Sequence, residues 1–254
     1  MPQLAQTRRS ARERGRPRTK AAVLVAQEIV RQVRARGLSA GDRLLSEQRM
    51  VERYGVARGT LREALRLLET QGVLVIKAGP GGGPELTTPD AGHLASTLAL
   101  LLQCVDAPFR AVVEARAIVE PGLARLAAER CTDADLQALA ASLERLRAAS
   151  GERAFAEEQR RFHDLIAVAA HNPVFAFLLP ALRRISRGSR LAYGAAQRRS
   201  AIAALARIHR AIAASDGDQA EVLMAAMLTR ALRSFDRHEA AAMQRPVAWS
   251  DAHE

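Results

Sequence analysis

Two arginines one helical turn apart, Arg58 and Arg62, are the residues of this sequence best suited to specific chemistry. Side chains four residues apart lie on one face of a helix. A guanidinium group donates two hydrogen bonds to O6 and N7 of guanine, the commonest base-specific contact in the major groove of DNA. Thr60, between them, suits a phosphate or a thymine methyl group. The pattern predicts a helix that contacts base edges, and the alternative is a solvated face shared with Glu63 and Glu69.

Three predicted helices would position these arginines. The first covers residues 21–36 and ends at Gly37, a residue type that often stops helices. The second begins after Ser46, whose hydroxyl suits an N-cap, and ends at Gly55. The third contains both arginines, and its inner face carries a row of leucines: Leu61, Leu65 and Leu68.

A wing is predicted after the third helix. Residues 73–76 are apolar and β-branched enough for a short strand, residues 78–84 are a glycine-rich loop, and residues 85–87 would return as a second strand. Gly79 lets this loop approach the minor groove or the phosphates without a side chain in the way. Lys77 supplies positive charge beside it.

Positive charge is concentrated in the N-terminal third. Residues 1–86 hold 17 Lys or Arg against 8 Asp or Glu, a net +9, whereas residues 87–254 hold 21 against 19, a net +2. Such a segment indicates a polyanionic partner. Seven of the basic residues lie within residues 1–20, which lack periodicity and are predicted to form a disordered basic arm. The alternative is a tail that only aids solubility.

Composition limits the remaining function classes. Hydrophobic residues make up 48% of the 254-residue chain and aromatic residues 4%, and the abundance of Ala, Leu and Arg favours helices. Cys104 and Cys131 have no metal-type spacing, and no apolar run reaches the roughly 20 residues that span a bilayer. No catalytic triad, phosphate loop or Cys/His cluster is visible. We therefore expect a cytoplasmic protein that is not an enzyme and does not contact membranes.

Beyond a linker at residues 88–93, the sequence is predicted to be helical throughout. Helices are expected at about 93–104, 108–130, 133–149, 152–170, 173–192, 199–215 and 217–239. Asp133, Asn172 and Asp216 would cap helix starts, and Pro121 should bend or interrupt the second of these helices. Six or seven helices with short connections indicate an antiparallel bundle over residues 94–240, followed by a tail at 241–254.

The segment before the wing closely resembles the GntR family of bacterial regulators. The match rests on Leu38-Ser39-Ala40-Gly41-Asp42-Arg43-Leu44-Leu45-Ser46-Glu47 and Tyr54-Gly55-Val56-Ala57-Arg58-Gly59-Thr60-Leu61-Arg62-Glu63-Ala64-Leu65-Arg66-Leu67-Leu68-Glu69. The resemblance implies that residues 21–87 form a winged helix-turn-helix whose third helix enters the major groove. It also implies a set of DNA-contacting residues: Gln48, Arg58, Gly59, Thr60, Arg62, Lys77 and Gly79. Family members often carry Arg where this chain has Gln48.

Most of residues 94–239 resembles the FCD domain, the helical effector domain of the FadR-type branch of that family. The resemblance rests on Glu114-Ala115-Arg116-Ala117-Ile118-Val119-Glu120-Pro121, Phe162-His163, Asn172-Pro173, Ala211-Ile212, Asp216, Ala220 and Met224. Many FCD domains hold a divalent metal with one Asp and three His. His163 matches the first His, but the other ligand positions fall on Gln159, Leu205 and Met227, which suit zinc or nickel poorly. We expect no metal cofactor; His163 and His209 would be ligands only in a different register.

The same resemblance implies an effector site lined by Arg116, Gln159, His163, Leu205 and Met227. In this branch an Arg at the position of Arg116 commonly pairs with an effector carboxylate, which a guanidinium fork suits. The alternative is an i,i+4 pair with Glu120. His163 could donate a hydrogen bond to the effector, or it could be a core histidine packed by Phe162 and Ile166.

The sequence thus predicts a mainly α protein that binds double-stranded operator DNA with an inverted repeat as a homodimer. Two-fold symmetry would pair two recognition helices with the two half-sites. We expect a sequence-specific transcriptional regulator, most commonly a repressor in this family, controlled by a small-molecule metabolite such as a carboxylate. The competing hypothesis is a non-specific basic DNA-binding protein whose helical domain only dimerises.

Overall fold

The computed structural model describes residues 3–79, 82–88, 90–186 and 194–252, with side chains from residue 19 onward. The chain divides into two units, Met1–His93 and Leu94–Glu254, each with its own hydrophobic core. Helices dominate the described residues, and the strands among them form one small sheet. The mainly α class is therefore confirmed.

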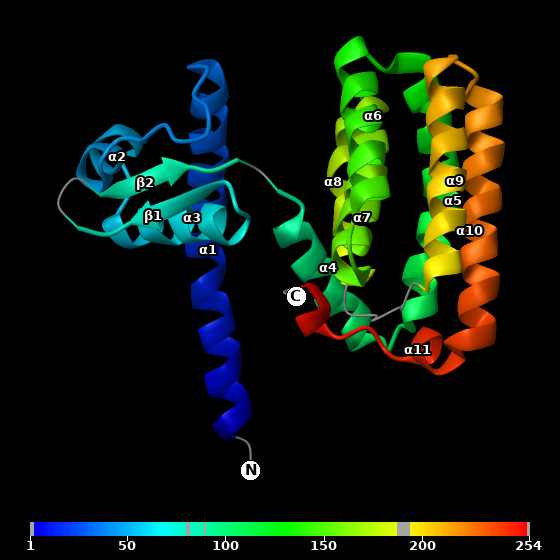
Figure 1. Ribbon diagram of the computed structural model, residues 1–254. Helices are drawn as coiled ribbons and strands as arrows, with labels where there is room; N and C mark the ends of the chain where they lie inside the picture. Colours follow the sequence, from blue (N-terminus) through cyan, green and yellow to red (C-terminus); the bar gives the residue numbers. More distant parts are fainter. Residues whose placement is uncertain (1–2, 80–81, 89, 187–193, 253–254) are drawn as a thin grey trace. The chain divides into compact units, whose positions relative to one another are not determined.

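The N-terminal unit consists of three helices and a two-stranded wing (Figure 1). Its elements are α1 (Gln3–Ala35), α2 (Glu47–Tyr54), α3 (Arg58–Thr70), β1 (Leu74–Lys77) and β2 (Gly83–Leu86). The strands pair antiparallel, with Leu74 opposite Leu86. A bridge between Arg43 and Glu85 adds the segment before α2 to the sheet edge. This arrangement is the winged helix-turn-helix that the sequence predicts.

The turn between α2 and α3 follows from its capping residues. The Ser46 hydroxyl accepts a bond from the backbone N–H of Arg49 at 3.5 Å, so it caps α2 as predicted. At the other end Gly55 has a left-handed φ of +60°, which glycine adopts without steric cost, and its N–H bonds to the Val51 carbonyl. The core that α3 joins contains residues of α1 and α2, such as Ile29 and Met50.

Helix α1 is longer than the sequence predicts, because it begins at Gln3 instead of at Ala21. Residues 3–20, expected as a disordered arm, continue this helix, and residues 1–2 lie outside the described part of the chain. Ala and Arg are strong helix formers, so a stretch without an apolar stripe can still be helical. The apolar periodicity that the prediction used reports which residues pack against a core. Those of α1 are Ala22, Val25, Ala26 and Ile29.

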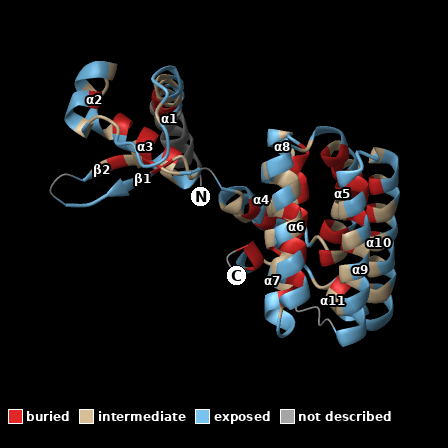
Figure 2. Cartoon of the chain, turned by 45° about the horizontal axis from the view of Figure 1, so that its top comes forward, coloured by how far each residue is buried: buried red, intermediate tan, exposed pale blue. Residues whose placement is uncertain are grey.

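The C-terminal unit is a bundle of long helices that run alongside one another (Figure 1). They are α5 (Phe109–Arg130), α6 (Asp133–Ala148), α7 (Glu152–Ala169), α8 (Pro173–Ile185), α9 (Ala195–Ala213) and α10 (Gly217–His238), and the shorter α4 (Gly92–Cys104) precedes them. Figure 2 shows buried residues on the faces of these helices that point into the bundle. That core includes Leu123, Leu139, Phe162, Ile208 and Met224.

The helix starts show which predicted caps form. Asn172 Oδ1 accepts from the N–H of Val174 at 3.1 Å, and Asp216 Oδ1 accepts from that of Gln219 at 3.0 Å, as predicted. Asp133 does not cap α6. The preceding Thr132 does so, in a reciprocal capping box with Asp135.

Two further expectations for these helices concern Pro121 and the end of α8. Pro121 does not interrupt α5, which continues to Arg130. Its missing N–H and ring clash cost about 3 kcal/mol, and the core contacts of Leu123 and Ala124 in the following turn offset that cost. Helix α8 ends at Ile185, and residues 187–193, which include the predicted end at 192, lie outside the described residues.

Residues 245–252 form a C-terminal strap instead of the predicted tail. After α11 (Ala240–Gln244), the chain returns along the bundle and ends its described part in a short 3-10 helix, Trp249–Ala252. Asp251 is buried and pairs with Arg245 at 2.9 Å, and the Ala252 carbonyl accepts from Arg184 Nε at 2.8 Å. The segment is too short to show an apolar periodicity, so its burial could not be predicted from sequence.

Among the described helices, none combines the length and the apolar character that crossing a membrane requires.

Candidate DNA-binding surface and ligand cavity

The outer face of α3 carries the two arginines that the sequence singled out. Arg58 and Arg62 are both exposed, and Arg66 continues the row one turn later. Gly59 is half-buried beside them. Thr60 differs, because its 8% exposed fraction places it on the buried face of the helix.

Arg62 forms an ion pair with the first turn of α2. Its Nε lies 3.0 Å from Glu47 Oε2, and both groups are substantially exposed. Exposed pairs of this kind contribute about 0–1 kcal/mol, so the guanidinium can exchange the carboxylate for a base or a phosphate. Gln48, the next residue of α2, is also exposed and donates to Glu52 at 3.5 Å. Glu47 was not predicted, although its place in the first turn after Ser46 could have indicated it.

The wing brings Lys77 and Gly79 to the same end of the sheet. Lys77 Nζ lies 2.6 Å from Glu85 Oε1 on the opposite strand, so its charge is held across the wing. Gly79 has φ +93°, a conformation that side chains disfavour. A Cβ on Gly82 would lie 2.3 Å from the Lys77 carbonyl oxygen. The loop therefore requires glycine at position 79 because of the backbone conformation, and at position 82 because a side chain has no space there.

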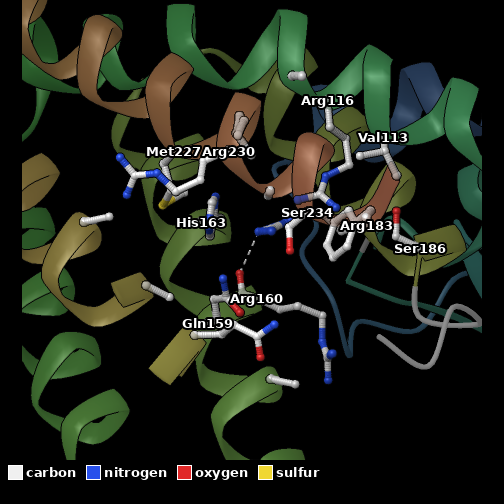
Figure 3. Close-up of a pocket in the computed structure, with 18 of the residues that line it drawn as sticks. Val113, Arg116, Gln159, Arg160, His163, Arg183, Ser186, Met227, Arg230 and Ser234 are labelled. Carbon is white, nitrogen blue, oxygen red and sulfur yellow. Dashed lines mark hydrogen bonds between the residues drawn. The ribbon is translucent and has the colours of Figure 1, made fainter. Parts of the chain in front are cut away.

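The C-terminal unit encloses a cavity of about 280 Å³ bounded by α5, α7, α8, α9 and α10 (Figure 3). This size suits a small metabolite. Four of the predicted effector-site residues line it: Arg116, Gln159, His163 and Met227. Leu205 does not, because it is fully buried in the bundle core. On α9 the cavity is lined instead by residues such as Ala201 and Ala204, which lie on a different face of the helix.

Glu120 lies behind the cavity wall and bonds to two of the residues that line the cavity, Arg116 and His163. Its Oε1 accepts from Arg116 Nε at 2.8 Å, and its Oε2 lies 2.5 Å from His163 Nδ1. Burial acts to raise the pKa of Glu120, but the Arg116 charge and the bond from His163 outweigh it and hold the pKa well below its usual range. The i,i+4 pair weighed for Arg116 is thus present, and Arg116 lines the cavity as well.

His163 is buried and neutral at pH 7, because burial lowers the pKa of its imidazole. An ionised carboxylate can only accept hydrogen bonds. Nδ1 therefore carries the ring proton, and this N–H donates a hydrogen bond to Glu120. The other nitrogen, Nε2, is then a hydrogen-bond acceptor, and the described residues give His163 only the bond through Nδ1. The core histidine that the sequence left as an alternative is therefore also a cavity residue.

Arg183 of α8 is a buried cation in the cavity wall. Its Nε donates to Asp164 at 2.8 Å and its Nη2 to the Arg160 carbonyl at 2.9 Å, the bond drawn in Figure 3. Burial lowers the pKa of Arg183 to about 10, which leaves it charged at neutral pH. No sequence prediction included this residue. The available signal was an arginine one turn after Leu179 and next to Leu182, on the apolar face of its helix.

These residues do not fit the divalent metal of many FCD domains. His163 Nε2 is oriented as in metal sites, where the other ring nitrogen bonds a carboxylate. Its cavity neighbours Gln159 and Met227 are poor ligands, and Leu205 cannot ligate. Among the described residues, no three His, Cys, Asp or Glu side chains gather into a ligand set. His209 lies elsewhere on α9, in a smaller hollow against α6.

An exposed row of arginines on a winged helix-turn-helix, joined to a helical unit that encloses a polar cavity, is the construction of a two-domain DNA-binding regulator. Comparison with known proteins gives the same result. Residues 22–82 match the bacterial regulatory proteins of the gntR family, and residues 111–230 match the FCD domain.

Relatives of known class support this assignment. The HTH-type transcriptional regulator LutR of Bacillus subtilis (strain 168) is 30% identical over 200 residues, which cover 76% of this chain and 90% of LutR. The HTH-type transcriptional repressor NanR of Enterobacter sp. (strain 638) is 29% identical, over 66% of this chain and 65% of NanR. The chain thus spans about two thirds of NanR. The Streptococcus agalactiae GntR structure shares the fold, with a TM-score of 0.65 at 22% identity, and covers 84% of this chain and 99% of its own.

The chain belongs to the GntR family of transcriptional regulators and carries an FCD effector-binding domain. It is a DNA-binding regulator, as the sequence predicts.

Proposed function

We propose that this regulator is a repressor that binds an inverted-repeat operator as a homodimer and releases it when a small carboxylate occupies the FCD cavity. The observation that carries the proposal is the set of four arginines lining one cavity: Arg116, Arg160, Arg183 and Arg230. Guanidinium groups pair with carboxylates through two parallel hydrogen bonds. Among the described residues that line the cavity, Glu239 is the only acidic one, so positive charge predominates there.

Repression and dimerisation are supported by separate arguments. NanR, one of the relatives, is named as a repressor. A single α3 contacts one half-site, and a two-fold dimer supplies a second copy about 34–36 Å away, one turn of the DNA helix. The proposed DNA contacts are Arg58, Arg62, Gln48, Gly59, Lys77 and Gly79. Thr60 is left out because its side chain is buried.

Control by the ligand requires that the carboxylate bind more tightly to the DNA-free state than to the DNA-bound state. The bundle helices that line the cavity would then favour one arrangement of the two DNA-binding units over another. The segment that joins the units, which ends where α4 begins at Gly92, is where such a change would reach the winged helix.

A competition binding experiment tests the proposal. Labelled DNA from the region upstream of the protein's own gene is bound by purified protein and challenged with random DNA, with and without small carboxylates. We expect a preference of about 10³-fold or more for the operator, and weaker operator binding when an effective acid is added. Light scattering should give the mass of two chains.

A second candidate, a non-specific DNA-binding protein, is suggested by the net charge of +9 in residues 1–86. It predicts that random DNA competes equally well and that all binding falls steeply with salt. That result, with no response to any carboxylate, would replace the proposal by this candidate.

A further inference from the structure

The α7–α8 side of the cavity presents a cation and a hydrogen-bond acceptor on the same wall, Arg183 and His163 (Figure 3). We propose that these two side chains anchor a small hydroxy acid without a metal. The carboxylate binds Arg183, and the hydroxyl group donates to Nε2 of His163. This inference rests on the proposed function, which assigns a carboxylate to the cavity, and adds the residues that hold it and the second group that the ligand carries.

Arg183 has donors left for a ligand after its bonds within the protein. A guanidinium group carries five N–H bonds, and the contacts to Asp164 and to the Arg160 carbonyl use Nε and one N–H of Nη2. Nη1 bonds to no group in the described residues, although the side chain is 4% exposed and lines the cavity. A buried cation with unused donors favours an anion strongly, because little water competes for it.

The same guanidinium supplies the positive charge that a carboxylate requires. Its two bonds within the protein fix its orientation, so the carboxylate meets a cation that is already positioned. Arg116 adds a second guanidinium on α5 and holds Glu120 in its ionised form. Anion binding in this cavity therefore needs no divalent ion.

His163 determines the second group of the ligand. Its Nδ1 proton is committed to Glu120, so Nε2 can only accept a hydrogen bond while the ring is neutral. A group that donates beside a carboxylate is either a hydroxyl or an ammonium. The cavity is lined by four arginines, which repel an ammonium group, so the hydroxyl is favoured.

Three acids of equal carbon number test this selectivity: lactate, propionate and alanine, which differ only at C2. Titration calorimetry on the full-length, chelator-treated protein measures each affinity. We expect lactate to bind about tenfold more tightly than propionate, the effect of one buried hydrogen bond, and alanine to bind most weakly. Malate and succinate form a second matched pair, which serves if the cavity prefers a longer acid. The wild-type comparison needs no variant.

Two variants then assign the residues. His163→Phe should remove the preference for lactate over propionate, because it deletes the Nε2 acceptor. It also deletes the bond to Glu120, so the ratio of the two affinities is the readout. Arg183→Lys should weaken both acids by about tenfold, since a lysine keeps the charge but loses the fork. Arg153→Met is the matched control, because that arginine is 93% exposed and lies outside the cavity. It should change neither affinity.

The outcomes separate the two proposals. Equal affinities within both pairs, or a lactate preference that survives in His163→Phe, overturn the hydroxy-acid inference and leave the carboxylate effector standing. Binding that requires added zinc overturns the metal-free anchor. If none of the five acids binds, the carboxylate effector fails together with this inference.

Discussion

The imidazole Nδ1 of His163 lies 2.5 Å from Oε2 of Glu120, and both side chains are at least 96% buried. A histidine and a carboxylate this close in the interior form a charge-assisted hydrogen bond, strong when complete and costly when one partner is removed. The pair joins α5 to α7 directly at the wall of the ligand cavity.

Replacing Glu120 should therefore destabilise the protein strongly. Glu120→Gln leaves Arg116 without its ion-pair partner and weakens the bond to His163, and breaking a buried pair costs about 3–5 kcal/mol. Glu114→Gln on the same helix is the control, because Glu114 is exposed and pairs with Arg110 at the surface. Urea denaturation measures both variants. Equal stabilities for the two would contradict the network described for Glu120.

Acid should destabilise the protein in two stages. Burial lowers the pKa of His163 below its ordinary 6.5, so the unfolded chain takes up a proton that the folded one refuses, and stability falls as the pH drops below 6.5. The pKa of Glu120 is also lowered, so its contribution is present above its ordinary 4.5 and is lost on further acidification. Thermal denaturation across this range measures both stages.

The histidine stage has its own control. His163→Gln should remove the loss that begins below pH 6.5, whereas replacing the exposed His238 by Gln should leave it unchanged. If the melting temperature of the wild type does not change between pH 6.5 and 4.5, the inference that His163 is buried in its neutral form is wrong.

Arg62→Ala should greatly weaken specific DNA binding and leave the fold intact. Loss of a bidentate guanine contact costs about 1–3 kcal/mol, a reduction in operator affinity of roughly tenfold to a hundredfold. The ion pair with Glu47 that the variant loses is exposed, so its melting temperature should match the wild type. Retained operator affinity would refute the role of Arg62.

Small carboxylates, but not metals, should raise the melting temperature of chelator-treated protein. A ligand at about 100 times its Kd adds roughly 2.7 kcal/mol, and each kcal/mol moves the midpoint by about 2–4 °C in a domain of this size. The panel contains zinc, nickel and manganese, alone and combined with acids. A large shift with a metal alone would mean that His163 is a metal ligand.

Two glycines should respond oppositely to alanine. Gly82→Ala places a Cβ against the Lys77 carbonyl, so the wing must change shape and operator affinity should fall. Gly122→Ala on α5 meets no atom within 4 Å and should stabilise the protein by about 0.5–1 kcal/mol, because alanine favours helix. Operator titration and thermal denaturation of both variants check this contrast. Unchanged DNA affinity in Gly82→Ala would show that the wing makes no contact.

The sequence predicted the DNA-binding unit more completely than the cavity. Ser46, Gly55 and Gly79 act through local backbone conformation, which neighbouring residues determine and sequence reveals. The sequence did not reveal the burial of Thr60, because the inward face of α3 is wider than its leucine row suggests.

The cavity depends on partners that are distant in sequence. Glu120 meets His163 43 residues away, and no local pattern announces such a pair. Glu120 was therefore considered only as an i,i+4 partner of Arg116, and Arg183 was passed over although it lies on an apolar helix face. Leu205 was assigned to the site by register alone, and a rotation of one residue on α9 separates the core from the cavity.

The C-terminal strap gives the protein an optical property. Trp249 is the sole tryptophan of the sequence, and its indole N–H donates to Ser96 of α4 at 2.8 Å while its backbone N–H donates to Gln103 at 2.6 Å. Trp249 is 46% exposed, so the wavelength of its fluorescence will change if the strap moves on α4. All tryptophan emission therefore reports on the first helix after the linker, so events in the FCD domain can be followed without attaching a dye.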